Sequence, residues 1–301
     1  MTQACAGRVV IVTGAGRGIG RCHALEMARQ GAKVVVNDLG TSAAGAGASD
    51  TPAAAVVAEI ERLGGSAIAN TEDIADWDGA GRLVAAAIAE WGRLDVVVNN
   101  AGFLRDRMFV SATVEEWDAV MRVHLRGHFC VTRHAAAHWR AASKAGEPVD
   151  ARIINTSSGA GLLGSIGQSA YSAAKAGITA LTLVQAAELQ RYGVTANAIA
   201  PAARTRMTED AFPDMMRAPA SGFDKMAPEN IAPLVAWLAS KESSGVTGRV
   251  FEIAGGEISI ADGWRTAAKK DKGTRWETAE LGAVIGDLLA ESPDAERVYG
   301  T

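Results

Sequence analysis

The chain has 301 residues, 48% of them hydrophobic, which is enough for one large buried core or two small ones. Its 30 basic and 34 acidic residues give a net charge of −4, which argues against a general positive field for nucleic acid or an anionic membrane. No apolar stretch approaches the roughly 18 residues that span a bilayer, and the N-terminal region lacks the pattern of a signal peptide, so we expect a cytoplasmic enzyme or binding protein.

Short apolar runs alternate with segments of helical periodicity along most of the chain. Runs without internal alternation are typical of parallel strands buried on both faces. The expected strands cover residues 8–13, 32–38, 66–73, 94–102, 151–158, 194–201 and 248–256, and the expected helices about 21–32, 52–63, 77–91, 113–143, 171–191 and 228–240. This order predicts an α/β fold, a doubly wound seven-stranded parallel sheet of the Rossmann type with right-handed crossovers.

Two segments fall outside this alternation. Residues 39–51 form a loop of small residues that is too long for an ordinary strand-to-helix connection, and we expect it to be mobile. The tail from about residue 264 is more polar and contains one expected helix at 277–291, with an apolar stripe. The predicted organisation is one domain over 1–263 and a C-terminal extension over 264–301.

A glycine-rich turn lies between the first strand and the first helix. Glycines at 14, 16, 18 and 20 let the backbone turn sharply and approach a pyrophosphate at the positive end of a helix. The spacing is GxxxGxG, with Ile19 where GxGxxG would have a glycine. Tight turns also need glycine, so this stretch alone does not define a cofactor site.

Asp38 adds a second indication of a dinucleotide. It ends the second strand eighteen residues after Gly20, where a carboxylate can accept hydrogen bonds from both ribose hydroxyls of NAD and would repel a 2′-phosphate. A helix cap or turn aspartate is the alternative interpretation. Arg17 offers a charge that would suit a phosphate, so NADP remains the alternative cofactor.

Tyr171 and Lys175 lie four residues apart at the start of an alanine-rich run, so a helix places both on one face. An ammonium at about 4 Å, with an effective dielectric of about 20, attracts a phenolate by about 4 kcal/mol. That energy lowers the pKa of a phenol by about 3 units, which brings it close to neutral pH. The same spacing also occurs by chance on solvated helices.

Together with Asn99-Asn100-Ala101-Gly102 and with Ser158, thirteen residues before Tyr171, these motifs resemble the short-chain dehydrogenase/reductase family over about residues 7–260. The resemblance implies a Rossmann-type domain that binds a nicotinamide cofactor. By the same resemblance Tyr171 is the catalytic acid/base, Lys175 holds ribose hydroxyls and lowers the pKa of the tyrosine, and Ser158 hydrogen-bonds the substrate oxygen.

The resemblance also assigns the cofactor contacts. Asp73 and Ile74 fall where the family contacts adenine, Asn100 and Ala101 where it lines the adenosine ribose, and Pro201 to Thr205 where it holds the nicotinamide amide. The full implied set is Gly14, Arg17, Gly18, Ile19, Gly20, Asp38, Asp73, Ile74, Asn100, Ala101, Gly102, Tyr171, Lys175, Pro201 and Thr205.

The chain departs from the family pattern at two positions. His124 replaces the usual asparagine of the helix after the NNAG motif, and Pro201-Ala202 replaces Pro-Gly. In the family that asparagine supports a water relay to the lysine mainly through its backbone carbonyl, which a histidine can keep. We therefore count His124 with Ser158, Tyr171 and Lys175 as catalytic.

Four further stretches, 37–40, 104–107, 123–127 and 204–208, resemble the (3R)-hydroxyacyl-CoA dehydrogenase region of the peroxisomal multifunctional enzyme type 2. This implies NAD-dependent interconversion of a 3-hydroxyacyl-CoA and a 3-oxoacyl-CoA, with an acyl-CoA as the expected small-molecule partner. A hydroxysteroid or another bulky secondary alcohol is the alternative substrate. A non-catalytic dinucleotide-binding regulator is a third reading, against which Ser158, Tyr171 and Lys175 count.

Two histidine pairs, His124 with His128 and His134 with His138, have the i,i+4 spacing of a metal site, but no HExxH pattern or carboxylate cluster supports one, so we expect no metal. The three cysteines are widely spaced, and we expect buried reduced thiols. Four methionines suit an adaptable acyl pocket or ordinary core packing. These are Met207, Met215, Met216 and Met226.

The helices at 113–143 and 171–191 carry more apolar surface than one sheet covers. Members of the family that the chain resembles commonly pair these helices as a four-helix bundle between subunits. We expect a homodimer or a homotetramer.

Overall fold

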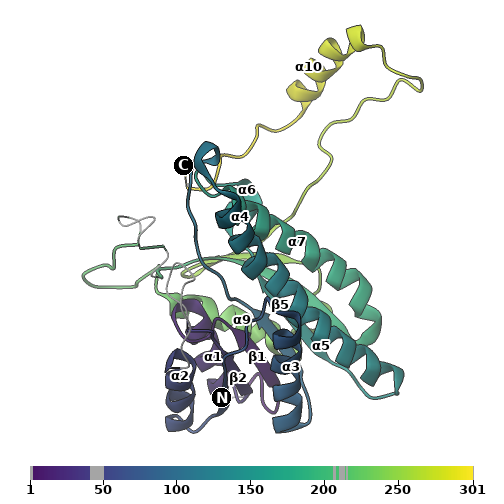
Figure 1. The fold of residues 1–301 in the computed structure, drawn as a ribbon. Helices are drawn as coiled ribbons and strands as arrows, with labels where there is room; N and C mark the ends of the chain where they lie inside the picture. Colours follow the sequence, from purple (N-terminus) through teal and green to yellow (C-terminus); the bar gives the residue numbers. More distant parts are fainter. Residues whose placement is uncertain (1–2, 41–50, 206–207, 210–213, 215, 301) are drawn as a thin grey trace.

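In the computed structural model of the chain, residues 3–40, 51–205, 208–209, 214 and 216–300 are described. They form one twisted sheet with helices on both faces (Figure 1). The strands are β1 (Val9–Thr13), β2 (Lys33–Asn37), β3 (Ser66–Asn70), β4 (Val96–Asn99), β5 (Ala151–Thr156), β6 (Val194–Ala202), β7 (Val250–Ala254) and β8 (Glu257–Ala261). Most of the loop predicted over 39–51 lies outside the described residues.

The parallel part of the sheet agrees with the prediction. The strand order is β3-β2-β1-β4-β5-β6-β7-β8, and β1 to β7 pair in parallel. Within β1, Val10 and Val12 pack in the core on one face while Val9 and Ile11 pack in the core on the other. The strand is therefore apolar at every position because both of its faces are covered.

The predicted number of strands was wrong, because the sheet has eight. β8 pairs antiparallel with β7, with Ile253 opposite Ile258. The two strands are joined through Gly255, which has φ of +61°, and Gly256. A glycine pair between apolar runs is a hairpin signal, and the prediction took it for the end of the sheet. Ile258 and Ile260 are more than half exposed, so β8 is an edge strand.

Helices cover the sheet in two layers. One layer contains α1 (Gly18–Arg29), α2 (Thr51–Arg62) and α9 (Ala232–Ala239), and the other contains α3 (Trp77–Trp91), α5 (Gly127–Lys144) and α7 (Ser169–Leu189). Short 3-10 turns occupy Phe109–Ser111, Gln190–Tyr192, Pro228–Ile231, Glu242–Gly245 and Thr278–Glu280. No helix in the described ranges is both long and apolar enough to cross a bilayer.

The single helix predicted at 113–143 is interrupted. It begins as α4 (Val114–Met121), which Thr113 and Glu116 cap with reciprocal hydrogen bonds, and it continues as α5. Between them lies a π-helical turn over Arg122–Arg126, in which the Gly127 N–H reaches back to the Arg122 carbonyl. Such turns are rare in proteins, and those that do occur are often found at functional sites. This one carries His124.

The tail contains the predicted helix, α10 (Leu281–Glu291), but that helix stands apart from the body of the molecule (Figure 1). None of its residues is buried in the described chain, and Leu281, Ile285 and Leu289 are exposed. The described residues of its own subunit do not bury this helix, so docking on a neighbouring subunit stays a prediction. The chain after α10 does return to the body, where the Tyr299 N–H donates to the Gly164 carbonyl at 2.9 Å.

Candidate active site

A cavity of about 440 Å³ opens where the carboxyl ends of β1, β2, β4, β5 and β6 meet. Sheet order reverses between β1 and β4, which is the position at which open α/β sheets bind ligands. The predicted residues that line it are Gly14, Arg17, Gly18, Ile19, Gly20, Asp38, Asp73, Ile74, Asn100, Ala101, Gly102, His124, Tyr171, Lys175, Pro201 and Thr205. Ser158 lies beside it and hydrogen-bonds Tyr171.

The glycine-rich turn is shaped by close backbone approach. A Cβ on Gly14 would lie 2.7 Å from the Cα of Ala101, and a Cβ on Gly20 would lie 2.1 Å from the Gly14 carbonyl oxygen. The Asn100 amide donates to the carbonyls of Thr13 at 3.0 Å and Gly14 at 3.2 Å, which ties the turn to the end of β4. The turn is thus a cradle that side chains would fill, as a bound pyrophosphate requires.

Asp38 faces this cradle from the end of β2. Its Oδ2 accepts a hydrogen bond from the Gly16 N–H at 2.8 Å, and its Oδ1 accepts one from the Gly40 N–H at 2.7 Å. The turn interpretation of Asp38 is therefore correct as geometry, and it does not compete with the cofactor interpretation. Backbone donors fix the carboxylate where it lines the cavity.

The two ends of the cavity are held by packing. At one end, Asp73 pairs with Arg122 at 2.6 Å, and buried Ile74 lies against Gly127, whose Cβ would be 2.7 Å from the isoleucine Cδ1. At the other end, the methyl group of Thr205 lies 3.5 Å from the Cβ position of Gly18. The segment after β6 therefore reaches over to the glycine-rich turn.

Tyr171 and Lys175 lie in the first two turns of α7. The Lys175 Nζ donates to the Thr156 carbonyl at 2.6 Å and lies 5.5 Å from the centre of the Tyr171 ring. Burial raises the pKa of Tyr171 to about 12, although the Ser158 hydrogen bond acts in the opposite direction. Burial lowers the pKa of Lys175 to about 7. Burial thus favours the neutral form of both groups.

His124 is fully enclosed beside this pair. Its Nε2 lies 2.8 Å from the Phe103 carbonyl oxygen and 3.0 Å from the Phe103 N–H nitrogen, and its ring meets Tyr171 edge-on at 5.2 Å. Burial and the charge of Lys175 lower the pKa of His124 to about 3, so the ring is neutral. A Cβ on Gly102 would lie 2.2 Å from the His124 Cε1, so the histidine depends on that glycine.

Sequence reasoning missed Tyr299. Its ring lies against Gly159, the residue after Ser158, where a Cβ would be 2.2 Å from the Tyr299 Cε2. A charge on Tyr299 would raise the pKa of Tyr171, as would the charge of Asp106, so both groups are close to the Tyr171 phenol. An isolated tyrosine in a polar tail gives no periodicity or motif by which to find it.

The remaining predicted features lie outside the cavity. All three cysteines are buried and free, as predicted. His134 packs on Trp77, with ring centres 4.3 Å apart, and no group of three or more potential metal ligands occurs among the described residues. Met216 is buried and Met226 is half-buried, whereas Met207 and Met215 lie outside the described residues.

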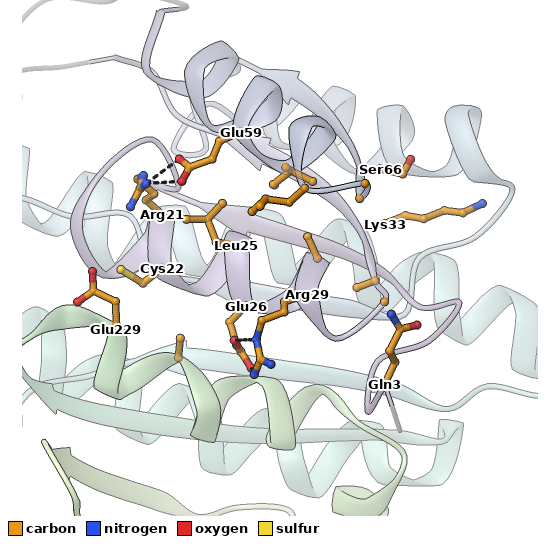
Figure 2. Close-up of a pocket in the computed structure, with 18 residues that line it drawn as sticks. Gln3, Arg21, Cys22, Leu25, Glu26, Arg29, Lys33, Glu59, Ser66 and Glu229 are labelled. Atoms are coloured by element: carbon orange, nitrogen blue, oxygen red, sulfur yellow. Dashed lines mark hydrogen bonds and ion pairs between the residues drawn. The ribbon is translucent and has the colours of Figure 1, made fainter. Parts of the chain in front are cut away.

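A second cavity, of about 850 Å³, lies on the α1–α2 side of the molecule (Figure 2). Two ion pairs lie in it: Arg21 pairs with Glu59 and Arg29 pairs with Glu26, each at 2.6 Å. It reaches Lys33 and Ser66, at the amino ends of β2 and β3, which is the opposite edge of the sheet from the catalytic group. We therefore place the active site in the smaller cavity.

The family model for short chain dehydrogenases matches residues 8–216. The chain belongs to the short-chain dehydrogenase/reductase family and is an oxidoreductase. Over 296 residues it is 45% identical to hydroxyacyl-CoA dehydrogenase ChsB1 of Mycobacterium tuberculosis, covering 96% of this chain and 90% of that protein.

Two more relatives extend the comparison. Peroxisomal multifunctional enzyme type 2 of Mus musculus is 43% identical over 279 residues, which are 93% of this chain and 34% of the mouse protein. The crystal structure of a short chain dehydrogenase from Mycobacterium avium superposes with a TM-score of 0.89 at 56% identity, covering 99% of this chain and all of the other.

Proposed function

We propose that the chain is an NAD-dependent 3-hydroxyacyl-CoA dehydrogenase that interconverts the secondary alcohol and the 3-ketone of an acyl-CoA. The observation that carries this is the grouping of Ser158, Tyr171 and Lys175 beside a cradle shaped for a dinucleotide. Relatives named as a hydroxyacyl-CoA dehydrogenase and a peroxisomal multifunctional enzyme support the substrate class. An intact proton-transfer group counts against a non-catalytic regulator.

The residues of the cavity fit NAD. The glycine-rich turn would hold the pyrophosphate, Asp38 the adenosine ribose, Asp73 and Ile74 the adenine, and Lys175 the nicotinamide ribose. When bound, the cofactor supplies a hydride acceptor for the alcohol and a hydride donor for the ketone. The Asp38 carboxylate would repel the extra phosphate of NADP.

In the proposed mechanism Ser158 orients the substrate oxygen and Tyr171 removes the hydroxyl proton. A phenol whose pKa is near 12 needs help to do this at neutral pH. A charged Lys175, 5.5 Å from the ring centre, would stabilise the phenolate by about 3 kcal/mol at an effective dielectric of about 20, or about 2 pKa units. Because the pKa of Lys175 is itself about 7, this help is lost as pH rises through 7 unless something keeps the lysine protonated.

The first prediction tests the function. The purified chain should reduce NAD, read as NADH absorbance, with a (3R)-hydroxyacyl-CoA in preference to steroid alcohols. Tyr171→Phe should lower kcat by about 100-fold or more, because it removes the proton-transfer group, and it should leave the Kd for NADH nearly unchanged. Substantial turnover by Tyr171→Phe, or a preference for steroids, would contradict the proposal.

The second prediction concerns the cofactor. The kcat/KM with NAD should exceed that with NADP by about tenfold or more, which corresponds to at least about 1.4 kcal/mol in the transition state. Asp38→Asn should narrow that ratio, because it removes the charge but keeps an acceptor for the Gly16 N–H. Equal kcat/KM with both cofactors in the unmodified enzyme would show that Asp38 does not decide the choice.

The third prediction is assembly as a homodimer or homotetramer. Apolar side chains are exposed on the faces predicted to pair, namely Phe129 on α5 with Leu183 and Val184 on α7. Light scattering at micromolar concentration should give a multiple of the 31.2 kDa chain mass. Leu183→Glu with Val184→Glu should reduce the mass, whereas Leu63→Glu, at an exposed apolar residue after α2, should not. A monomeric parent protein would contradict the proposal.

The fourth prediction concerns the tail, which we propose helps to close the acyl site. Because Tyr299 packs beside Ser158 against Gly159, Tyr299→Ala and truncation after Asp262 should both raise the KM for long acyl-CoAs more than the KM for NAD. Trp264→Ala, in the same tail but fully exposed, is the control and should change neither constant. Unchanged constants in the truncated enzyme would remove the tail from the site.

A further inference from the structure

His128 is a buried polar side chain that the mechanism above does not use. It lies on α5 with no exposed surface, and neither ring nitrogen has a hydrogen-bond partner among the described residues. Burying an imidazole without partners is unfavourable, and buried polar groups in proteins are rarely left without them. Its position therefore needs an explanation.

The helix face that carries His128 is fixed at both ends. His124, His128 and Thr132 follow one another at intervals of four residues, so they share a face. The Thr132 hydroxyl accepts a hydrogen bond from the Asn99 amide at 2.8 Å, and His124 contacts Phe103. His128 is thus held between two anchored neighbours and faces the carboxyl end of β4.

The same edge of the sheet carries the Lys175 ammonium. Asn99 of β4 is in register with Asn155 of β5, and the Thr156 carbonyl that holds the Lys175 Nζ is the next residue along β5. Neighbouring strands lie about 4.8 Å apart, so the His128 ring and the Lys175 Nζ approach the sheet at adjacent positions. The π-helical turn that precedes α5 also packs closely on α7, since a Cβ on Gly177 would lie 3.1 Å from the Leu125 side chain.

A comparison with His23 shows that the environment of His128 is specific. His23 also has no exposed surface and no partner for either ring nitrogen among the described residues. Burial alone lowers the pKa of His23. The pKa of His128 is lowered by burial and, next, by the charge of Lys175, while the nearby backbone of His124 and Asn99 acts in the opposite direction.

We propose that His128 is a positioning residue that keeps Lys175 protonated. Its neutral ring turns one N–H toward the carbonyl of His124 or Asn99, and presents the other nitrogen as an acceptor to the ammonium through one buried water. The inference rests on the proposed function, since it explains how a buried lysine stays charged beside the catalytic phenol.

The charged and titratable groups around this assembly are few. Lys175 of α7 and His124 of the π-helical turn face His128, and β4 contributes only the uncharged Asn99. Tyr171, the group that reports the effect, is faced in addition by Asp106 and Tyr299. No carboxylate among these groups faces Lys175 or His128, so a neutral acceptor is what the site offers the ammonium.

The test is the ionisation of Tyr171 in the NAD complex. The chain has three tyrosines, so the difference in phenolate absorbance between an enzyme and its Tyr171→Phe derivative reports Tyr171 alone. In His128→Leu the midpoint should move to higher pH by about half a unit or more, because a less protonated Lys175 stabilises the phenolate less. The acidic limb of kcat against pH should move in the same direction.

Two variants serve as controls. His128→Gln keeps a donor and an acceptor and should recover part of the shift, and it also serves if His128→Leu does not fold. His23→Leu removes an equally buried ring elsewhere and should leave the Tyr171 midpoint in place. An unchanged midpoint in the His128 variants, or an equal shift in His23→Leu, would overturn the inference. If the enzyme oxidises no 3-hydroxyacyl-CoA, the proposed function fails while the absorbance titration still decides the role of His128.

Discussion

The proposed mechanism depends on a positive charge in a place where burial opposes it. Lys175 is enclosed at the carboxyl edge of the sheet, and burial alone lowers its pKa to about 7. Burial also opposes ionisation of the neighbouring phenol, because it raises the pKa of Tyr171 to about 12. The two penalties can offset each other only if lysine is charged when tyrosine ionises. In the proposed mechanism, groups that hold the ammonium, such as the Thr156 carbonyl, would therefore matter for proton transfer along with the tyrosine itself.

The same edge of the sheet explains why residues from distant parts of the sequence meet. Parallel strands all end there, and the reversal of strand order between β1 and β4 leaves a crevice between them. Asn100 closes the crevice from one side by holding the carbonyls of Thr13 and Gly14. Glycines then set how deeply the backbone can approach, since Gly14 and Gly20 lie where any Cβ would collide with backbone. The strand order therefore produces the cavity, and a few glycines determine its depth.

Much of this was predictable from sequence because the signals were local or motif-based. Apolar runs gave the seven parallel strands, and fixed spacings gave the glycine-rich turn and the pair Tyr171 and Lys175. Features that depend on tertiary context were not predictable. β8 is an edge strand whose apolar residues alternate with polar ones and are half exposed, so it lacks the continuous apolar run that marked the parallel strands, and only the glycine pair before it signalled a hairpin. The π-helical turn at Arg122–Arg126 has no residue pattern that distinguishes it from an ordinary helix. Tyr299 reaches the site only because the chain folds back.

In the C-terminal tail, the exposed helix α10 lies between the end of the sheet and Tyr299, and this helix needs a source of stability. An isolated helix of eleven residues is marginal in water, and α10 exposes Leu281, Ile285 and Leu289 while no residue of it is buried in the described chain. Its apolar face would therefore gain stability from a surface that the described residues of its own subunit do not supply. A neighbouring subunit of the proposed oligomer could supply that surface. It would then order the C-terminal tail, whose last residues include Tyr299. Assembly and closure of the acyl site would then be linked, because the contact that stabilises α10 also holds Tyr299 against Gly159.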